Sequence, residues 1–155
     1  MRQNNFLQRG GRWVIAQSIL TLAVLALAPV LRGQGRNAPI TILGLVLFGV
    51  GSWFGIAGVR SLGRNRTPYP QPLEDSTLVQ HGVYKVVRHP LYSSLMFLSV
   101  GWAMVWGSSA ALAAAGALTL LLHAKARREE RWLRERYSEY RDYERRVKRF
   151  VPGVW

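Results

Sequence analysis

The stretch PLYSSLMFLSVGWAMVWGSSAALAAAGALTLLLH, residues 90–123, decides the fold, because it contains no Lys, Arg, Asp or Glu. A transmembrane helix needs roughly 20 predominantly apolar residues. Gly107, Ser108 and Ser109 interrupt the stretch near its middle and are typical of a turn. We therefore predict two apolar helices joined as a hairpin, the second of them short for a full crossing.

Two further stretches without charge precede this one, Trp13–Leu31 and Asn37–Val59. A short polar turn at residues 32–39 joins them, so they are predicted to form a second hairpin. The first stretch is not read as a cleaved signal peptide, because no small-x-small cleavage site follows it. The sequence thus predicts an all-α integral membrane protein with about four transmembrane helices.

The composition agrees with a protein that meets two solvents, since 49% hydrophobic residues accompany a net charge of +13. Most of the acidic residues, and about half of the basic ones, lie between Lys125 and Arg149. The basic residues flank membrane spans and alternate with glutamate, which favours anionic lipid headgroups over nucleic acid as partner. The chain has no cysteine, which excludes thiolate chemistry, and its three histidines are too widely spaced to predict a metal site.

The basic residues also predict the orientation of the chain. With four spans, the N-terminal residues, the loop from Arg60 to Arg88 and the C-terminal tail lie on one side, which the positive-inside rule makes cytoplasmic. Pro68, Pro70 and Pro72 make a continuous helix unlikely in that loop. We expect a multi-pass protein of the cell inner membrane with both termini cytoplasmic, Arg2, Arg9 and Arg12 inside, and only Arg32 and Arg36 outside.

After His123 the pattern becomes amphipathic, with Leu133, Tyr137, Tyr140 and Val147 on one stripe and charged residues between them. This predicts a C-terminal amphipathic helix at the depth of the lipid headgroups. The tyrosines at positions 137, 140 and 143 are interpreted as interfacial belt residues.

The segment GVYKVVRHPLY, residues 82–92, is the densest chemical signal, because a polar loop there meets the start of the third span. Pro90 suits the first turn of a helix, where its missing N–H is not needed. Arg88 and His89 then stand at a helix N-terminus, which attracts an anion such as a carboxylate or a phosphate.

A second signal follows the fourth apolar segment, where Lys125 and Glu129 fall four residues apart on one helical face and Glu130 comes next. Spacing alone favours a surface salt bridge between Lys125 and Glu129. A functional interpretation of these residues needs a further argument.

That argument is a resemblance to the isoprenylcysteine carboxyl methyltransferase family and its bacterial relatives, which are membrane methyltransferases that use S-adenosylmethionine. The pattern G-x-Y-x-x-x-R-H-P-x-Y is met by Gly82, Tyr84, Arg88, His89, Pro90 and Tyr92. The pattern E-E-x-x-L is met by Glu129, Glu130 and Leu133, and the ending R-F-x-P by Arg149, Phe150 and Pro152. The resemblance covers about half of the chain, and the chain departs from it at Ser94, where the family often has glycine.

The resemblance implies a single domain over residues 1–155, with an N-terminal hairpin at 1–59 and a catalytic region at 60–155. It implies S-adenosylmethionine as cofactor and a small or lipid-like hydrophobic acceptor that reaches the site from the bilayer. Catalytic roles fall to Arg88, Glu130 and Lys125, the last directed toward the acceptor. The implied cofactor-binding residues are Leu78, Val79, Tyr84, His89, Pro90, Leu91, Tyr92 and Glu129.

Two other functions fit parts of the same pattern. Sterol-type membrane reductases, which use NADPH, look similar in the C-terminal helix and in the tyrosine-rich ending. A non-catalytic membrane module would also show simple helical hairpins. Binding of S-adenosylhomocysteine, of NADPH or of neither separates the three.

Overall fold

The computed structural model describes residues 10–33, 37–65, 67–69, 71 and 75–154, and this part of the chain is helical apart from turns, loops and one isolated bridge between Val87 and Lys148. The α-helices are α1 (Gly11–Val30), α2 (Ala38–Leu62), α3 (Pro90–Trp106), α4 (Ser109–Arg136) and α5 (Tyr140–Arg146). Two short 3-10 turns, η1 (Gly63–Asn65) and η2 (Gly82–Lys85), lie between α2 and α3. The predicted all-α fold is confirmed. Several residues used in the sequence argument lie outside the described residues, namely Arg2, Arg9, Arg36, Pro70 and Pro72.

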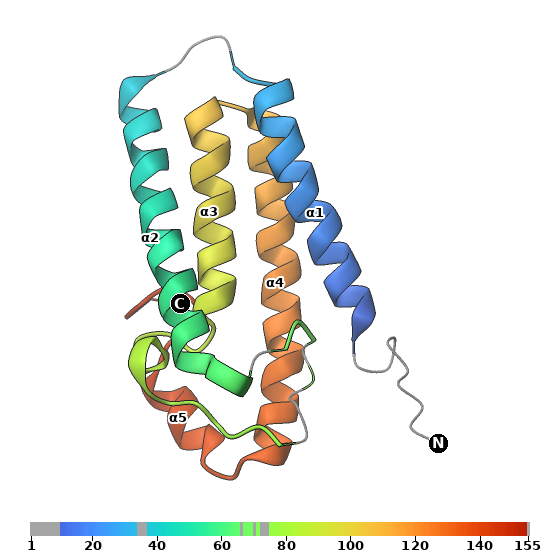
Figure 1. Ribbon diagram of the computed structural model, residues 1–155, viewed down its shortest axis with the longest axis vertical. Coiled ribbons are helices and arrows are strands. Elements are labelled where there is room, and N and C mark those ends of the chain that lie inside the picture. Colours follow the sequence, from blue (N-terminus) through green and yellow to red (C-terminus); the bar gives the residue numbers. More distant parts are fainter. Residues whose placement is uncertain (1–9, 34–36, 66, 70, 72–74, 155) are drawn as a thin grey trace.

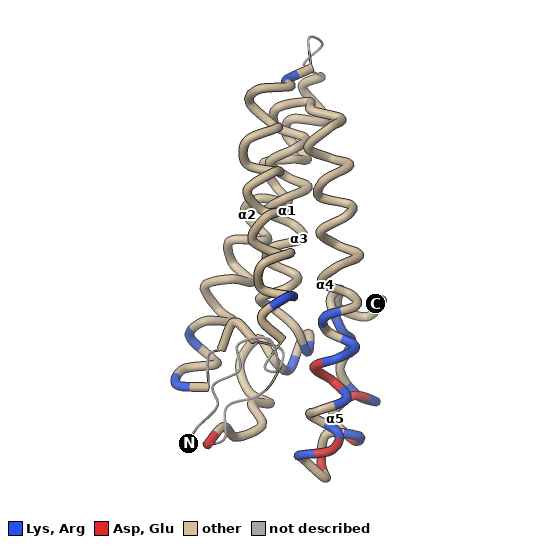
Figure 2. The backbone as a smooth tube through the Cα atoms, turned by 90° about the vertical axis from the view of Figure 1, so that its right-hand side faces the viewer, with Lys and Arg blue, Asp and Glu red and all other residues tan. Residues whose placement is uncertain are grey.

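The four long helices run side by side in the order α2, α3, α4, α1 (Figure 1), with α3 packed between α2 and α4. The turns after α1 and after α3 meet at one end, where the N–H of Gly33 donates to the carbonyl oxygen of Trp106 at 3.2 Å. The long loop and α5 lie at the opposite end, together with most of the charged residues (Figure 2). The charged residues and the long loop therefore gather at one end of a bundle that is otherwise apolar.

Three helices in the described residues are long and apolar enough to cross a bilayer: α1, α2 with its extension to Asn65, and α4. The fourth apolar helix, α3, is shorter at 17 residues. Large apolar side chains on the outside of the bundle are exposed, for example Leu22 at 64% and Leu120 at 73%. Lipid is the solvent that accommodates such a surface, and the protein is an integral membrane protein.

The helix boundaries in the second half of the sequence differ from the prediction in one respect. The hairpin turns at Gly107, as expected, with a φ of 62° that suits glycine. However, α4 does not end with the apolar segment, because it continues without a break for 28 residues to Arg136. The amphipathic helix expected after His123 is thus the end of α4 followed by the short α5. Residues 117–136 contain neither Gly nor Pro, so nothing in them ends a helix.

Glycines hold α2 close to α3. A Cβ atom at Gly51 would lie 2.9 Å from the backbone nitrogen of Leu98, and one at Gly55 would lie 2.7 Å from Oγ of Ser94. The Gly51 and Gly55 pair therefore allows close approach, as small residues do at helix interfaces in membranes. This contact fixes α3, whose first turn carries the motif, against α2.

Replacing Gly51 with alanine should lower the melting temperature in detergent, because the new methyl group meets backbone atoms of α3 that cannot move aside. Overpacking of this kind costs about 1–3 kcal/mol. The matched control is Gly49→Ala on the same helix, where a Cβ meets nothing within 4 Å. Equal melting temperatures for the two variants would contradict this packing.

Candidate functional site

The motif at residues 82–92 is placed by backbone contacts with the C-terminal tail. The N–H of Arg88 donates to the carbonyl oxygen of Lys148 at 2.8 Å, and that of His89 to Arg149 at 3.1 Å. Pro90 then opens α3, as expected from its position in the sequence. The tail thus pairs like a strand with the residues that enter α3.

A buried carboxylate, that of Glu130, joins three parts of the chain. Arg88 from the motif donates to Oε1 through Nε at 3.1 Å and Nη2 at 2.8 Å. Arg149 from the tail donates to Oε1 at 3.0 Å and to Oε2 at 2.6 Å, and Nε2 of His89 lies 3.1 Å from Oε1. The Glu130 side chain has no exposed surface, so these charge-assisted bonds must offset its loss of water. The two motif blocks therefore meet at α4, as the resemblance implied.

Arg88 has little capacity left for a ligand. Besides its two bonds to Glu130, Nη1 donates to the carbonyl oxygens of Glu144 at 2.6 Å and Val147 at 2.8 Å. Four of the five N–H groups of a guanidinium are thereby used by the protein. The main role of Arg88 is therefore structural, because its hydrogen bonds hold the motif against α5 and the tail.

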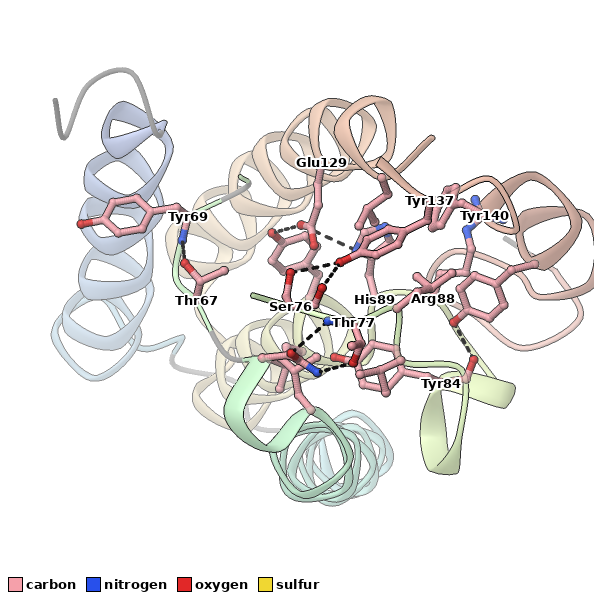
Figure 3. A pocket seen from close by; sticks show the side chains of 18 residues that line it. Thr67, Tyr69, Ser76, Thr77, Tyr84, Arg88, His89, Glu129, Tyr137 and Tyr140 are labelled. Carbon is pink, nitrogen blue, oxygen red and sulfur yellow. Dashed lines mark hydrogen bonds and ion pairs between the residues drawn. The ribbon is translucent and has the colours of Figure 1, made fainter. Parts of the chain in front are cut away.

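A pocket lies beside this cluster, between residues 67–69 and 76–79 of the long loop, η2, the first turn of α3, the end of α4 and α5 (Figure 3). Its volume is about 110 Å³. Ordinary ligand pockets begin at roughly 300 Å³, so this pocket is small for a nucleoside. The lining residues are Leu62, Asn65, Thr67, Tyr69, Ser76, Thr77, Leu78, Val79, Tyr84, Arg88, His89, Leu91, Tyr92, Glu129, Leu133, Tyr137, Tyr140 and Tyr143.

Glu129 is the acidic group on the wall of this pocket. The hydroxyl of Tyr92 donates to its Oε2 at 2.6 Å, and the ring of His89 stacks on Tyr92 with centroids 5.2 Å apart and an interplanar angle of 4°. Within the described part of the chain, Oε1 of Glu129 has no hydrogen-bond donor. One oxygen therefore stays available to a ligand that carries N–H or O–H groups.

The tyrosines of the C-terminal region line the pocket, which corrects their interpretation as belt residues. Tyr137 donates to the carbonyl oxygen of Ser76 and Tyr143 to that of Tyr84, both at 2.6 Å. Burial raises the pKa of the Tyr84 and Tyr143 phenols well above the ordinary value. No local sequence pattern could have found these two contacts, because the partners lie 61 and 59 residues away along the chain.

The structure brings the expected cofactor residues together with one exception. All of them line the pocket except Pro90, which packs against Gly58 of α2. Of the residues expected to be catalytic, Arg88 lines the pocket, whereas Glu130 lies behind it and Lys125 lies beyond Tyr92, with Nζ 5.2 Å from that ring.

Lys125 differs from the surface salt bridge that its spacing favoured. It is 2% exposed, and its Nζ donates to Oε1 of Gln17 at 2.7 Å and to the carbonyl oxygen of Pro68 at 3.0 Å. No carboxylate among the described residues lies within ion-pair distance of it. Gln17 was missed from the sequence, because a single amide in an apolar helix carries no motif.

These features define an all-α membrane protein with a polar, tyrosine-rich pocket at one end of its apolar helices. The chain matches the phospholipid methyltransferase family over residues 39–140, and it belongs to that family of membrane methyltransferases. The matched region includes both blocks that carry the resemblance noted above.

A curated relative adds a weaker comparison. The chain is 35% identical over 83 residues to the cobalt-zinc-cadmium resistance protein CzcN of Cupriavidus metallidurans, a match that covers 52% of this chain and 38% of the relative. The chain thus spans well under half of that protein's length. In the described residues, no group of three or more His, Cys, Asp or Glu side chains could hold a metal ion.

Replacing Glu130 with glutamine should destabilise the protein strongly, because two arginines lose their shared counter-ion inside the fold. Breaking a buried ion pair typically costs about 3–5 kcal/mol. Thermal unfolding in detergent measures the loss. Glu135→Gln is the control, since Glu135 is exposed and forms no ion pair with the described residues; a Glu130 variant as stable as this control would refute the role given to Glu130.

Proposed function

We propose that this protein transfers a methyl group from S-adenosylmethionine to a small or lipid-like acceptor at the cytoplasmic face of the membrane. The observation that carries the proposal is the meeting of the two motif blocks at one pocket beside the ends of apolar helices. The membership of a methyltransferase family supports the reaction class. The identity of the methyl donor and the class of acceptor are what we propose beyond this reaction class.

The pocket residues suit the polar parts of this cofactor. The available oxygen of Glu129 can accept from an amino group or from ribose hydroxyls, and the remaining N–H of Arg88 can reach toward a carboxylate. The rings of Tyr84 and Tyr92 offer aromatic faces to a sulfonium cation. The hydroxyl of Tyr140 is buried and, among the described residues, lacks a hydrogen-bond partner. It is a further group that a ligand can satisfy.

Methyl transfer requires the protein to position the donor and the acceptor, and it requires no covalent bond to the protein. When bound, the cofactor would supply a methyl group on a sulfonium: an electron pair of the acceptor would form a bond to the methyl carbon as the carbon–sulfur bond breaks, and S-adenosylhomocysteine would leave as a neutral thioether. An acceptor carboxylate is already ionised at neutral pH, so this chain needs no general base for it. Glu130 and Arg88 hold the motif in place, and Lys125 contributes positive charge behind Tyr92 that attracts an anionic acceptor.

Lipid access follows from where the pocket lies. The charged end of α4 and α5 lie at the same end of the bundle (Figure 2), and the pocket lies beside them. The positive-inside rule favours the cytoplasmic side for this end. We propose the cell inner membrane as the location, with both termini on the cytoplasmic side. An acceptor dissolved in the bilayer then approaches along the apolar helices.

Glu129→Gln should weaken binding of S-adenosylhomocysteine at least tenfold, because the amide removes the charge that faces the ligand's amino group. Calorimetry on the detergent-purified protein measures this, with Glu135→Gln as a control that keeps wild-type affinity. Transfer of radiolabel from S-adenosylmethionine into a lipid extract should fall in parallel. Saturable binding of NADPH instead would support a reductase, and binding of neither would support a non-catalytic module; each result would overturn the proposal.

A further inference from the structure

A second cavity lies on the face of α4 that points away from the pocket described above. It has a volume of about 560 Å³ and lies between the start of α1 and the charged half of α4. We call it the arginine groove, and its lining residues are Trp13, Ala124, Arg127, Arg128, Glu130, Arg131, Arg134 and Arg149. Glu130 and Arg149 also belong to the cluster that holds the motif. None of the residues that line the groove lines the cofactor pocket, so the two cavities are separate.

The charge of the groove is strongly positive. Five arginines face a single carboxylate, that of Glu130, which Arg88 and Arg149 already neutralise. Arg134 is occupied by Glu144 at 2.8 Å, and Arg128 lies 5.1 Å from the ring centroid of Trp132.

Of the five arginines that line the groove, Arg127 and Arg131 are the two with neither an ion pair nor a ring contact among the described residues. Both are exposed, and neither forms an ion pair within the described ranges. A pair between Arg131 and Glu135, which helical spacing would allow, does not form, although the equivalent Glu130–Arg134 contact is present at 3.7 Å. Two guanidinium groups on side chains one helical turn apart are well suited to the oxygens of a phosphate.

The composition of the groove is typical of a membrane interface. Trp13 begins the uncharged stretch of α1, and Ala124 ends the uncharged stretch that leads down α4. Tryptophan and arginine are the residues that mark membrane interfaces. Leu120, one turn before Ala124 on the same face of α4, is 73% exposed and offers apolar surface directly above the arginines. A ligand here meets cationic groups at one end and an apolar helix surface at the other.

We propose that the arginine groove binds an anionic glycerophospholipid, with its phosphate on Arg127 and Arg131 and its acyl chains along α1 and α4. This lipid is distinct from the methyl acceptor, because Glu129 and the cofactor pocket lie on a different face of α4. The bound lipid bridges α1 to α4. At the same end of these two helices, Lys125 of α4 donates a hydrogen bond to Gln17 of α1. The inference does not depend on the methyl-transfer reaction.

The test compares thermal unfolding of the full chain in detergent with and without added lipid. Phosphatidylglycerol should raise the melting temperature of the wild type by several degrees, whereas phosphatidylcholine with the same acyl chains and inorganic phosphate should not. The variant Arg127→Gln/Arg131→Gln should melt like the wild type without lipid and lose most of the shift. The control Arg141→Gln/Arg145→Gln removes as much charge from α5, outside the groove, and should keep the shift.

Three results would overturn the proposal. A full shift in the Arg127/Arg131 variant would place the lipid elsewhere. An equal loss in the control would reduce the effect to overall charge. Stabilisation by phosphatidylcholine or by inorganic phosphate alone, as large as that by phosphatidylglycerol, would exclude an anionic lipid as the specific ligand.

Discussion

The buried carboxylate of Glu130 is the constraint on which the site depends. It receives hydrogen bonds from Arg88 and Arg149, which stand at the entry to α3 and in the C-terminal tail. Each of these segments is too short and too irregular to hold its place alone. A charge enclosed without water must keep its partners, and so the requirement to neutralise Glu130 fixes segments far apart in the sequence at one point. The pocket wall at residues 84–92 is a consequence of that requirement.

The helix α4 connects the different parts of the protein. Its apolar first half packs against α1 and α3, and its charged second half continues the same helix to Arg136. Glu129 then faces the pocket, Glu130 faces the motif, and Arg127 and Arg131 face the arginine groove. Because a helix turns by about 100° per residue, adjacent residues of one short segment can serve three different surfaces. A membrane span in this way positions groups that work at the membrane surface.

Much of the fold could be predicted from the sequence, because lipid makes strict demands. Stretches without charge mark the spans, Gly107 marks the hairpin turn, and Pro90 marks the start of α3. The end of α4 could not be placed, because its pattern changes from apolar to amphipathic while every residue still favours a helix. Of the site, the residues next to a motif were predictable. Tyr137, Tyr143 and Gln17 were not, because their partners lie far away in the sequence and no local pattern encodes such contacts.

The central claim, that a shared buried charge couples the tail and α4, is tested most directly by a double-mutant cycle on Glu130 and Arg149. Unfolding free energies in mixed micelles are compared for Glu130→Gln, Arg149→Gln and the double variant. Coupled residues show interaction energies of about 0.5–3 kcal/mol, and the account predicts that the double variant is more stable than the sum of the single losses allows, by an amount in that range. Additive losses, with no coupling between the two positions, would contradict it.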